Sequence, residues 1–201
     1  MYFVKTPAYL KQILPGAIWS VPDVKGIYLT FDDGPVTGVT DVVLDLLAEY
    51  QATATFFCIG DNVRKHHDLF KRIRNEGHVV GNHTFNHLNG WRTPLSKYLA
   101  NTEQCNGLVS AELFRPPYGR ITLRQLRQIR KDYKVIMWDV LSGDFDVRMT
   151  SDKCAANVIE NIEDGSIVVF HDSEKAAPRM LGALEKVLQH VKKHDIDTLL
   201  L

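Results

Sequence analysis

The chain has 201 residues, of which 45% are apolar, and this is enough for one domain with an ordinary hydrophobic core. Its 24 lysines and arginines balance 24 aspartates and glutamates. A balanced charge excludes a strong overall attraction to nucleic acid or to an anionic membrane surface. We therefore expect a local recognition site, no nucleic-acid partner and no obligate protein partner.

The cysteines and the N-terminal residues bear on the cellular compartment. Cys58, Cys105 and Cys154 are odd in number and widely spaced, which argues against a disulfide framework and against a cysteine-based zinc site. Charged residues and prolines interrupt residues 1–22, so no apolar block of signal-peptide length is present there. No stretch approaches the ~18 apolar residues that span a bilayer. By default we expect a cytoplasmic protein without a membrane span.

Short apolar runs with the composition of strands alternate with amphipathic stretches along the whole chain. In chain order the runs are IYLTF, TATFFCI, HVVGN, LFRPP, YKVIMWDV, SIVVF and TLLL. Strands that are apolar on both faces and separated by helices are typical of a parallel α/β sheet. The architecture is then either a barrel or an open doubly wound sheet. Helical spacing, with Thr40 as the first N-cap, predicts helices over residues 39–50, 63–75, 95–109, 123–131, 153–163 and 178–190.

Polar segments follow most of the predicted strands. DDGP follows the first, NHTFNH the third, RPPYG the fourth, the aspartate at 144 the fifth, and HDS the sixth. All strands of a parallel α/β fold end on the same face, and barrel active sites are built there. We therefore expect these segments to converge, although they are far apart in sequence.

The motif HTFNH suggests a metal site. A helical turn would place His83 and His87 on one side, with their Cβ atoms roughly 5–6 Å apart. Asp33 would complete the His/His/carboxylate set that holds catalytic zinc and leaves one position open. The alternative is that the histidines cap a loop and Asp33 belongs to an Asp-Gly-Pro turn. The equally spaced His190 and His194 lie among lysines, and we expect them to be solvated surface.

Asp32 and the RPPYG motif suggest a base and its support. Neighbouring residues at a strand end point in opposite directions, so Asp32 can accept a proton from a metal-activated water while Asp33 binds the metal. Arg115 is expected to grip Asp32 bidentately, although it could equally form a surface salt bridge. The backbone N–H of Tyr118 or Gly119 could help to stabilise an oxyanion.

The segment IVVFHDS offers an acid. His171 follows an apolar run and emerges at the rim, where Asp144 could orient it and raise its pKa; the alternative is a structural histidine. Phe145 and Val169 are expected to form an apolar wall of the pocket, or else simply core. Asp172 and the serine after it are expected to cap the segment that follows.

The motifs TFDDGP, HTFNH, RPPYG, the acidic segment around Asp144 and IVVFHD, in this order, resemble the five motifs of the polysaccharide deacetylases, the NodB-homology domain of carbohydrate esterase family four. The resemblance covers roughly residues 27–172. It implies a distorted, incomplete TIM-like barrel of about seven parallel strands with surrounding helices. It also implies a hydrolase that removes acetyl groups from N-acetylglucosamine-type polymers, or O-acetyl groups from xylan.

The resemblance also implies roles for individual residues. It places a divalent metal, with zinc favoured and cobalt, nickel or manganese as alternatives, on Asp33, His83 and His87. It makes Asp32 the base and His171 the acid. Arg115 would hold Asp32, Asp144 would tune His171, and the amide of Tyr118 would contribute to the oxyanion hole. We expect residues 1–201 to form one such domain.

One motif departs from the family pattern, and this keeps other functions open. The fourth motif commonly reads Asp-x-x-Asp-Trp, whereas this chain has LSGDF, with Leu141 and Phe145 at the outer positions. Asp144, which would support the acid His171, is present, but the residues expected to form the wall of the substrate pocket differ from the family pattern. The alternatives are a hydrolase of small cyclic amides of the ureide type and a catalytically inactive glycan-binding relative. A redox or metallochaperone role is disfavoured because no thiolate is among the proposed ligands.

Overall fold

The fold is a curled parallel half-barrel, seen in a computed structural model that describes residues 2–201. Its seven-stranded sheet has the order β5-β4-β3-β2-β1-β7-β6, and every pairing between these strands is parallel. The incomplete barrel expected from the motifs is thus confirmed, and the open doubly wound alternative is wrong. The strands are β1 (Tyr28–Asp32), β2 (Ala54–Cys58), β3 (Val79–Asn82), β4 (Leu113–Phe114), β5 (Lys134–Val135), β6 (Val140–Leu141) and β7 (Ile167–His171).

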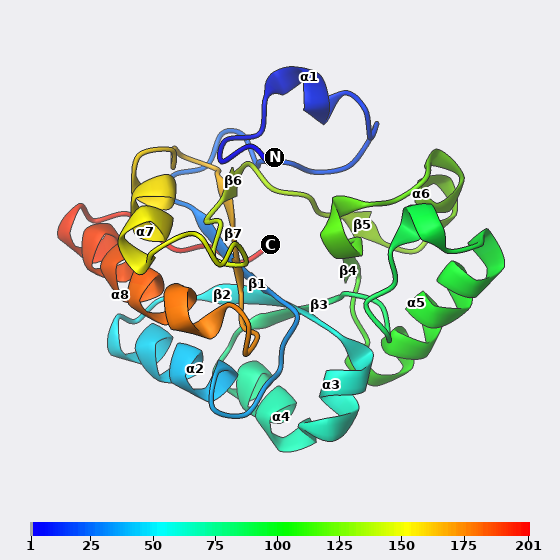
Figure 1. The fold of residues 1–201 in the computed structure, drawn as a ribbon, viewed down its shortest axis with the longest axis horizontal. Helices are drawn as coiled ribbons and strands as arrows, with labels where there is room; N and C mark the ends of the chain where they lie inside the picture. The colour runs from blue at the N-terminus through cyan, green and yellow to red at the C-terminus, as the bar shows by residue number, and fades with distance from the viewer. Residues whose placement is uncertain (1) are drawn as a thin grey trace.

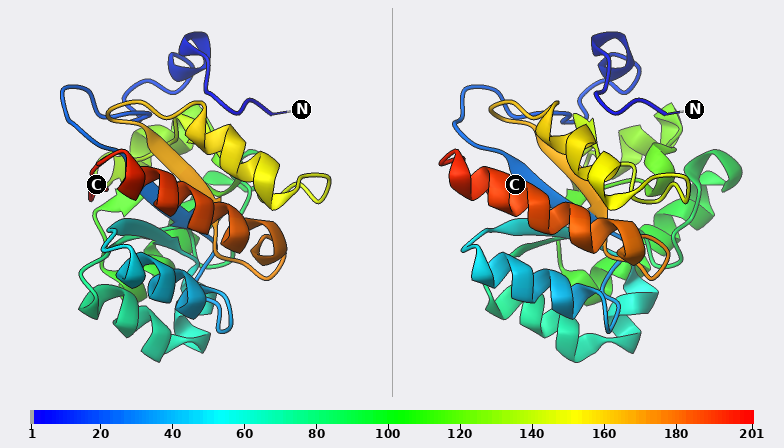
Figure 2. Two further views of the ribbon diagram at one scale, coloured as in Figure 1. Left: turned by 90° about the vertical axis from the view of Figure 1, so that its left-hand side faces the viewer. Right: turned by 60° about the vertical axis from the view of Figure 1, so that its left-hand side comes forward.

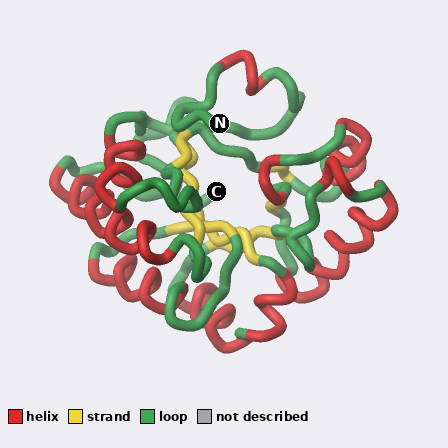
Figure 3. Tube along the Cα trace, viewed as in Figure 1, coloured by secondary structure: helices red, strands yellow, loops and turns green. Residues whose placement is uncertain are grey.

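Helices cover the outside of the curled sheet, while the strands line its interior (Figures 1 and 3). Helices lie in most of the connections between consecutive strands, as the crossover connections of a parallel sheet require. None of the helices within residues 2–201 has both the length and the apolar character that a membrane crossing requires. The helices are α1 (Ala8–Lys11), α2 (Thr40–Glu49), α3 (Gly60–Lys65), α4 (His67–Asn75), α5 (Leu95–Val109), α6 (Leu123–Ile129), α7 (Ser151–Ile159) and α8 (Ala177–Lys193).

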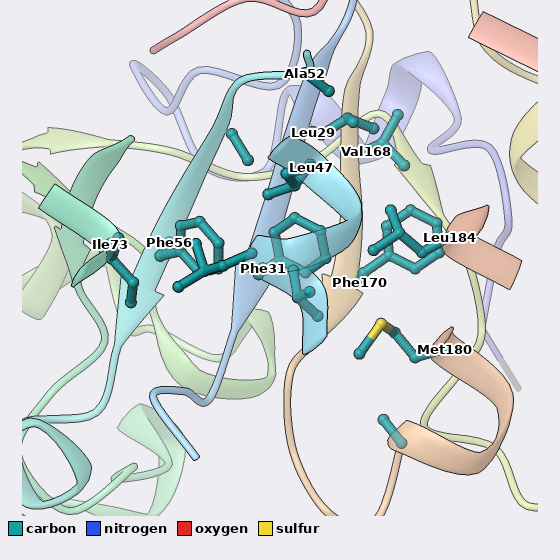
Figure 4. Packing of buried hydrophobic residues seen from close by; sticks show 14 of the residues in the cluster. Leu29, Phe31, Leu47, Ala52, Phe56, Ile73, Val168, Phe170, Met180 and Leu184 are labelled. Atoms are coloured by element: carbon teal, nitrogen blue, oxygen red, sulfur yellow. The ribbon is translucent and has the colours of Figure 1, made fainter. Parts of the chain in front are cut away.

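The main core lies between the central strands and the helices that pack on them (Figure 4). Phe31 of β1 stacks between Phe56 of β2 and Phe170 of β7, with ring centroids 5.0 and 5.9 Å apart. Leu47 of α2 and Leu184 of α8 pack on this layer and are fully buried. Each such side chain contributes about 1.5–3 kcal/mol through its burial. This packing fixes the positions of the strand ends that carry the polar motifs.

The N-terminal segment bridges the open side of the half-barrel between β6 and β5, where Figures 1 and 2 show it in dark blue. Val4 accepts a hydrogen bond from Leu141 of β6, and the amide of Ile18 donates to Val135 of β5, at N···O distances of 2.8 Å in both cases. The segment is also held by charge. The ammonium groups of Lys5 and Lys11 lie 2.5 and 2.9 Å from the fully buried carboxylate of Asp139.

Two predicted strands differ from the structure. The run YKVIMWDV supplies both β5 and β6, which lie at opposite edges of the sheet, because residues 136–139 cross the open side. There the amide of Met137 donates to Ile18 instead of to a neighbouring strand. The run TLLL is not a strand. It makes only an isolated bridge from Thr198 to Ile27, since β1 is already paired on both sides by β2 and β7.

Two predicted helical features also differ. The helix predicted over residues 63–75 is broken at His66, whose backbone is not helical, with φ −122° and ψ 49°. The break lets α3 pack against α5 while α4 packs against α2 and β3. Thr40 is the first residue of α2 and does not cap it. Its hydroxyl donates to Asp172 instead, at 2.6 Å.

Candidate active site

The polar motifs meet at the C-terminal ends of the strands, as the parallel sheet requires. Asp32 ends β1, His171 ends β7, and the two are direct partners in the register of these strands. His83 follows β3, and Arg115 follows β4. At these strand ends lies a pocket of about 410 Å³, which is lined by Tyr2, Asp32, Asp33, His83, His87, Tyr118, Arg120, Trp138, Leu141, Phe145, Val169 and His171.

Asp33, His83 and His87 offer three ligand atoms that lie within 4.8 Å of one another. Oδ1 of Asp33 lies 3.2 Å from Nε2 of His87 and 3.8 Å from Nε2 of His83. Donors that share one zinc ion at about 2.0–2.2 Å have similar mutual separations. The same Asp33 oxygen is buried and has no hydrogen-bond partner among residues 2–201. An orphaned carboxylate oxygen facing two imidazoles is a good fit for a shared divalent cation.

The state of the two rings also fits metal binding. Nδ1 of His83 lies 2.8 Å from the carbonyl oxygen of Arg115, and because a carbonyl can only accept, Nδ1 carries the proton. Nε2 then presents a lone pair toward Asp33. Burial lowers the pKa of His83 well below its usual range, and burial also lowers the pKa of His87. Both rings are therefore neutral at pH 7, which is the form that coordinates metals.

The HTFNH segment brings its histidines together without a helical turn, contrary to the expectation. Their ring centroids are 5.1 Å apart, but the segment is a loop in which Thr84 and His87 have φ values of 62° and 54°. Asn101 of α5 holds this loop, since its Oδ1 accepts from the amides of Phe85 and Asn86 at 3.0 Å each. The left-handed residues reverse the chain and return His87 to the side of His83.

Asp32 is buried and held by Arg115, although the grip is not bidentate. A single Nη1–Oδ1 hydrogen bond of 2.7 Å joins them. The remaining guanidinium donors go to the Thr30 hydroxyl and to two backbone carbonyls, and Arg115 is fully buried over the ring of Phe57. The surface salt-bridge alternative is therefore wrong. Oδ2 of Asp32 remains on the side of the metal-site histidines, 4.0 Å from Nε2 of His83.

His171 is paired with the buried Asp144, which follows β6. The Asp144 carboxylate accepts from the Nδ1–H of His171 at 2.7 Å and from its backbone amide at 2.7 Å. Burial by itself lowers the pKa of this imidazole, but the charge and hydrogen bond of Asp144 outweigh burial and raise the pKa of His171 to about 10. The ring is thus protonated at neutral pH and carries a second N–H, at Nε2.

The predicted wall residues line the pocket. The ring of Phe145 meets His171 edge-on at 5.4 Å, and Val169 is buried at its base. Tyr118 has a φ of 60°, and its exposed ring lies at a tilt of 50° to that of His87, with the ring centroids 4.5 Å apart. Neither His190, on α8, nor His194, directly after it, lines this pocket. His194 is exposed as expected, whereas His190 is partly buried.

Asp172 has a structural position that the sequence reasoning missed. It does not cap the following segment, because its carboxylate accepts from the amide of Gly34 at 2.9 Å and from the hydroxyl of Thr40. A Cβ on Gly34 would lie 1.9 Å from Asp172, so only glycine allows this approach. Burial raises the pKa of Asp172 to about 8. The side chain thus ties the turn after Asp33 to the end of β7.

Comparison with known proteins agrees with this geometry. Residues 20–137 match the family model for polysaccharide deacetylases, and the chain belongs to this family. It is 35% identical over 185 residues to a peptidoglycan-N-acetylglucosamine deacetylase of Bacillus cereus, covering 87% of this chain and 86% of the relative. It is 33% identical over 174 residues to a second one from that organism, covering 83% of this chain but only 63% of the relative.

A solved structure extends the likeness to nearly the whole chain. It is a peptidoglycan N-acetylglucosamine deacetylase in complex with 4-naphthalen-1-yl-N-oxidanyl-benzamide. The superposition has a TM-score of 0.86 at 30% identity and covers 98% of this chain and 95% of the other.

Proposed function

We propose that this protein is a metal-dependent hydrolase that removes acetyl groups from N-acetylglucosamine residues of a carbohydrate polymer or oligomer. The observation that carries the proposal is the orphaned Oδ1 of Asp33 facing His83 and His87, with Asp32 and His171 on the same pocket. The names of the similar proteins support the substrate class. The pocket at the strand ends is where such a fold places its chemistry.

We propose that Asp33, His83 and His87 hold the divalent cation. A set of two neutral imidazoles and one carboxylate favours zinc, with cobalt, nickel and manganese as alternatives. When bound, such a cation polarises a carbonyl group and makes a nearby water more acidic.

Asp32 is proposed as the base. Its Oδ1 is occupied by Arg115, so Oδ2 on the side of the histidines is the atom that accepts a proton from the attacking water. Arg115 holds the carboxylate in one orientation, and its own burial leaves it no other acidic partner among residues 2–201. The resulting hydroxide adds to the acetyl carbonyl carbon. The developing oxyanion then needs a donor, and the amide of Tyr118 is proposed for that place.

His171 is proposed as the acid. Because its Nδ1–H is bonded to Asp144, the N–H at Nε2 is the one that can reach the substrate. It donates its proton to the amide nitrogen as the C–N bond breaks, so that a neutral amine leaves with acetate as the second product. Phe145, Val169 and the ring of Tyr118 are proposed to contact the sugar.

The test is acetyl release from a tetramer of N-acetylglucosamine, followed by mass spectrometry, with zinc added and then chelated. We expect release that stops on chelation. Asp32→Asn should slow it about 10²–10⁴-fold while zinc affinity is unchanged, because the variant removes only the base. Tetramer binding without release would instead indicate a glycan-binding protein. Hydrolysis of a cyclic ureide but of no sugar would indicate the small-amide alternative.

We also infer that residues 1–201 form a single polysaccharide deacetylase domain, with the motifs between residues 27 and 172. The shared sheet and the N-terminal segment bonded to both of its edges support this. Limited proteolysis that releases no stable smaller fragment would agree with it, and two stable fragments would contradict it.

A further inference from the structure

Arg120 is a positive charge on the pocket that the proposed chemistry does not use. It lines the pocket together with Tyr118, two residues before it in the chain. Within residues 2–201 its guanidinium makes no ion pair, and its aromatic contact is with Trp91, whose ring centroid lies 5.3 Å from Cζ. Asp32 is bonded to Arg115, and Asp33 faces the two histidines of the proposed metal site. Within residues 2–201, Arg120 is therefore a pocket cation that forms a salt bridge with neither of these carboxylates.

The platform that carries Arg120 is built rigidly. The amide of Gly90 donates to the Arg120 carbonyl at 3.0 Å, and a Cβ on Gly90 would lie 2.3 Å from that oxygen. The indole N–H of Trp91 donates to the Ile121 carbonyl at 3.2 Å, and Gln125 donates to the carbonyl of Gly90 at 2.9 Å. These bonds hold the backbones of the two loops together and keep the exposed Arg120 side chain next to the indole of Trp91.

This arrangement has the features of a sugar-binding surface with a charge at its edge. The side chains of Trp91 and Tyr118 are 65% and 59% exposed, which leaves large aromatic surfaces open beside the pocket. A guanidinium that lies over an indole still presents N–H groups at its edge, and two of these can donate in parallel to the two oxygens of a carboxylate. The Tyr118 ring lies 4.5 Å from that of His87, so the platform adjoins the proposed metal site.

We propose that Arg120 is a specificity-determining residue that binds a carboxylate on the glycan, carried next to the sugar that loses its acetyl group. The preferred substrate is then an acetylated glycan that carries a carboxylate, and an uncharged glycan is a poorer substrate. This inference rests on the proposed function and deepens it. The carboxylate could belong to an ether-linked acid on the neighbouring sugar or to a peptide attached there, and the chemistry of recognition is the same.

The test compares wild type with Arg120→Gln on three tetrasaccharides. One contains only N-acetylglucosamine, one alternates it with N-acetylmuramic acid bearing free lactyl carboxylates, and one carries peptides amide-linked to those lactyl groups. We expect Arg120→Gln to lower kcat/KM roughly tenfold or more on an acidic substrate, the size of a hydrogen bond to a charged group. The neutral tetramer should change less than twofold. The acidic substrate that responds identifies the source of the carboxylate.

Two further variants and a salt series sharpen the test. Arg120→Lys should recover part of the loss, because lysine keeps the positive charge but lacks the paired N–H donors of the guanidinium. Arg124→Gln removes an exposed arginine of α6 outside the pocket and should change nothing. The preference for the acidic substrate should weaken as salt is raised. Equal effects of Arg120→Gln on neutral and acidic substrates, or no effect on either, would overturn the inference.

A failure of the proposed function would be seen separately. If wild type releases acetate from none of the three substrates, the hydrolase proposal fails. The affinity for the tetrasaccharide with free lactyl carboxylates, measured by calorimetry, then still tests whether Arg120 binds a carboxylate. Binding at least tenfold tighter by wild type than by Arg120→Gln supports the carboxylate site, and equal binding refutes it.

Discussion

Arg115 is the single side chain whose loss we expect to cost the most stability. Arg115→Met would leave the Asp32 carboxylate buried without its ion-pair partner, which typically costs about 3–5 kcal/mol. The free energy of unfolding in urea measures this loss. Arg148→Met is the control, because it breaks a pair with Asp146 in which the arginine is largely exposed, and its loss of stability should be much smaller. Comparable losses in the two variants would contradict our description of Arg115.

Asp144 should set the pH range in which the protein works. Wild-type His171, with its pKa raised to about 10, stays protonated through neutral and mildly alkaline pH. In Asp144→Asn the carboxylate is gone while burial still lowers the pKa, so the alkaline limb of the kcat profile should move to lower pH. An unchanged limb, measured on an acetylated oligosaccharide, would show that His171 is not the acid.

The same pair should contribute to stability in a defined pH window. Since folding raises the pKa of His171 from its ordinary 6.5 to about 10, the contribution is fully present below pH 6.5 and is lost as the pH rises through about 10. The difference in unfolding free energy between wild type and Asp144→Asn should therefore shrink over that range. A difference that grows with pH would contradict this assignment.

Among individual residues, the site residues that directly follow strands could be predicted from the sequence. Parallel strands bring their C-terminal ends together whatever their separation in the chain. Asp32, His83 and His171 were found in this way. Asp172 was missed because its partners, Gly34 and Thr40, lie more than 130 residues earlier, and no local spacing connects them. The single bond between Arg115 and Asp32 was not predictable either, since it depends on carbonyl groups that compete for the same guanidinium.

Among the elements, the HTFNH loop depends on one residue of α5. Asn101→Leu would remove the acceptor of the Asn86 amide and one of the two acceptors of the Phe85 amide, which also donates to the Asn101 carbonyl at 3.2 Å. A buried donor left without an acceptor costs about 1–3 kcal/mol. Because the loop carries His87, we expect zinc affinity to fall about 10–100-fold, as for other groups that support metal ligands. Competition with a chromophoric chelator measures this affinity.

A matched control lies further along the same helix, near its C-terminal end. The Asn106 side chain accepts from the amide of Ala111 at 3.0 Å, beyond the end of α5. Asn106→Leu should destabilise the fold while zinc affinity stays at the wild-type value. If both variants lowered zinc affinity equally, the effect would come from general destabilisation and not from the loop.

The elements themselves were largely predictable, and the exceptions have a common cause. The helix over Leu95–Val109 was predicted with its observed bounds. The break at His66 and the division of YKVIMWDV into β5 and β6 are set by which neighbours each part packs against. Periodicity describes one segment at a time and contains no information about those neighbours.

At the scale of the whole molecule, the N-terminal segment should be held by the buried charge of Asp139. The double variant Lys5→Met with Lys11→Met would leave that carboxylate with Ser166 alone, and we expect a loss of about 3–5 kcal/mol at pH 7. Although burial raises the pKa of Asp139, the two lysines outweigh it and lower the value below 3.8. The contribution is therefore present above pH 3.8 and lost as the pH falls through the folded-state pKa.

Urea unfolding at pH 7 and near pH 3 tests this prediction. The double variant should approach wild type at the lower pH. Lys186→Met, which removes an exposed pair with Asp152 on the surface of α8, should cost no more than about 1 kcal/mol at either pH. A loss in the double variant that is independent of pH would show that packing, and not the charge of Asp139, holds the segment.

Our central claim is that the curled parallel sheet brings Asp33, His83 and His87, from two loops, around a single metal ion. Anomalous diffraction at the zinc edge, from crystals grown with one equivalent of zinc, tests it most directly. We predict a single strong peak about 2.0–2.2 Å from a carboxylate oxygen of Asp33 and from Nε2 of both His83 and His87. A crystal in which zinc binds elsewhere, for example at His190 and His194, and leaves these three residues without a peak would contradict the account.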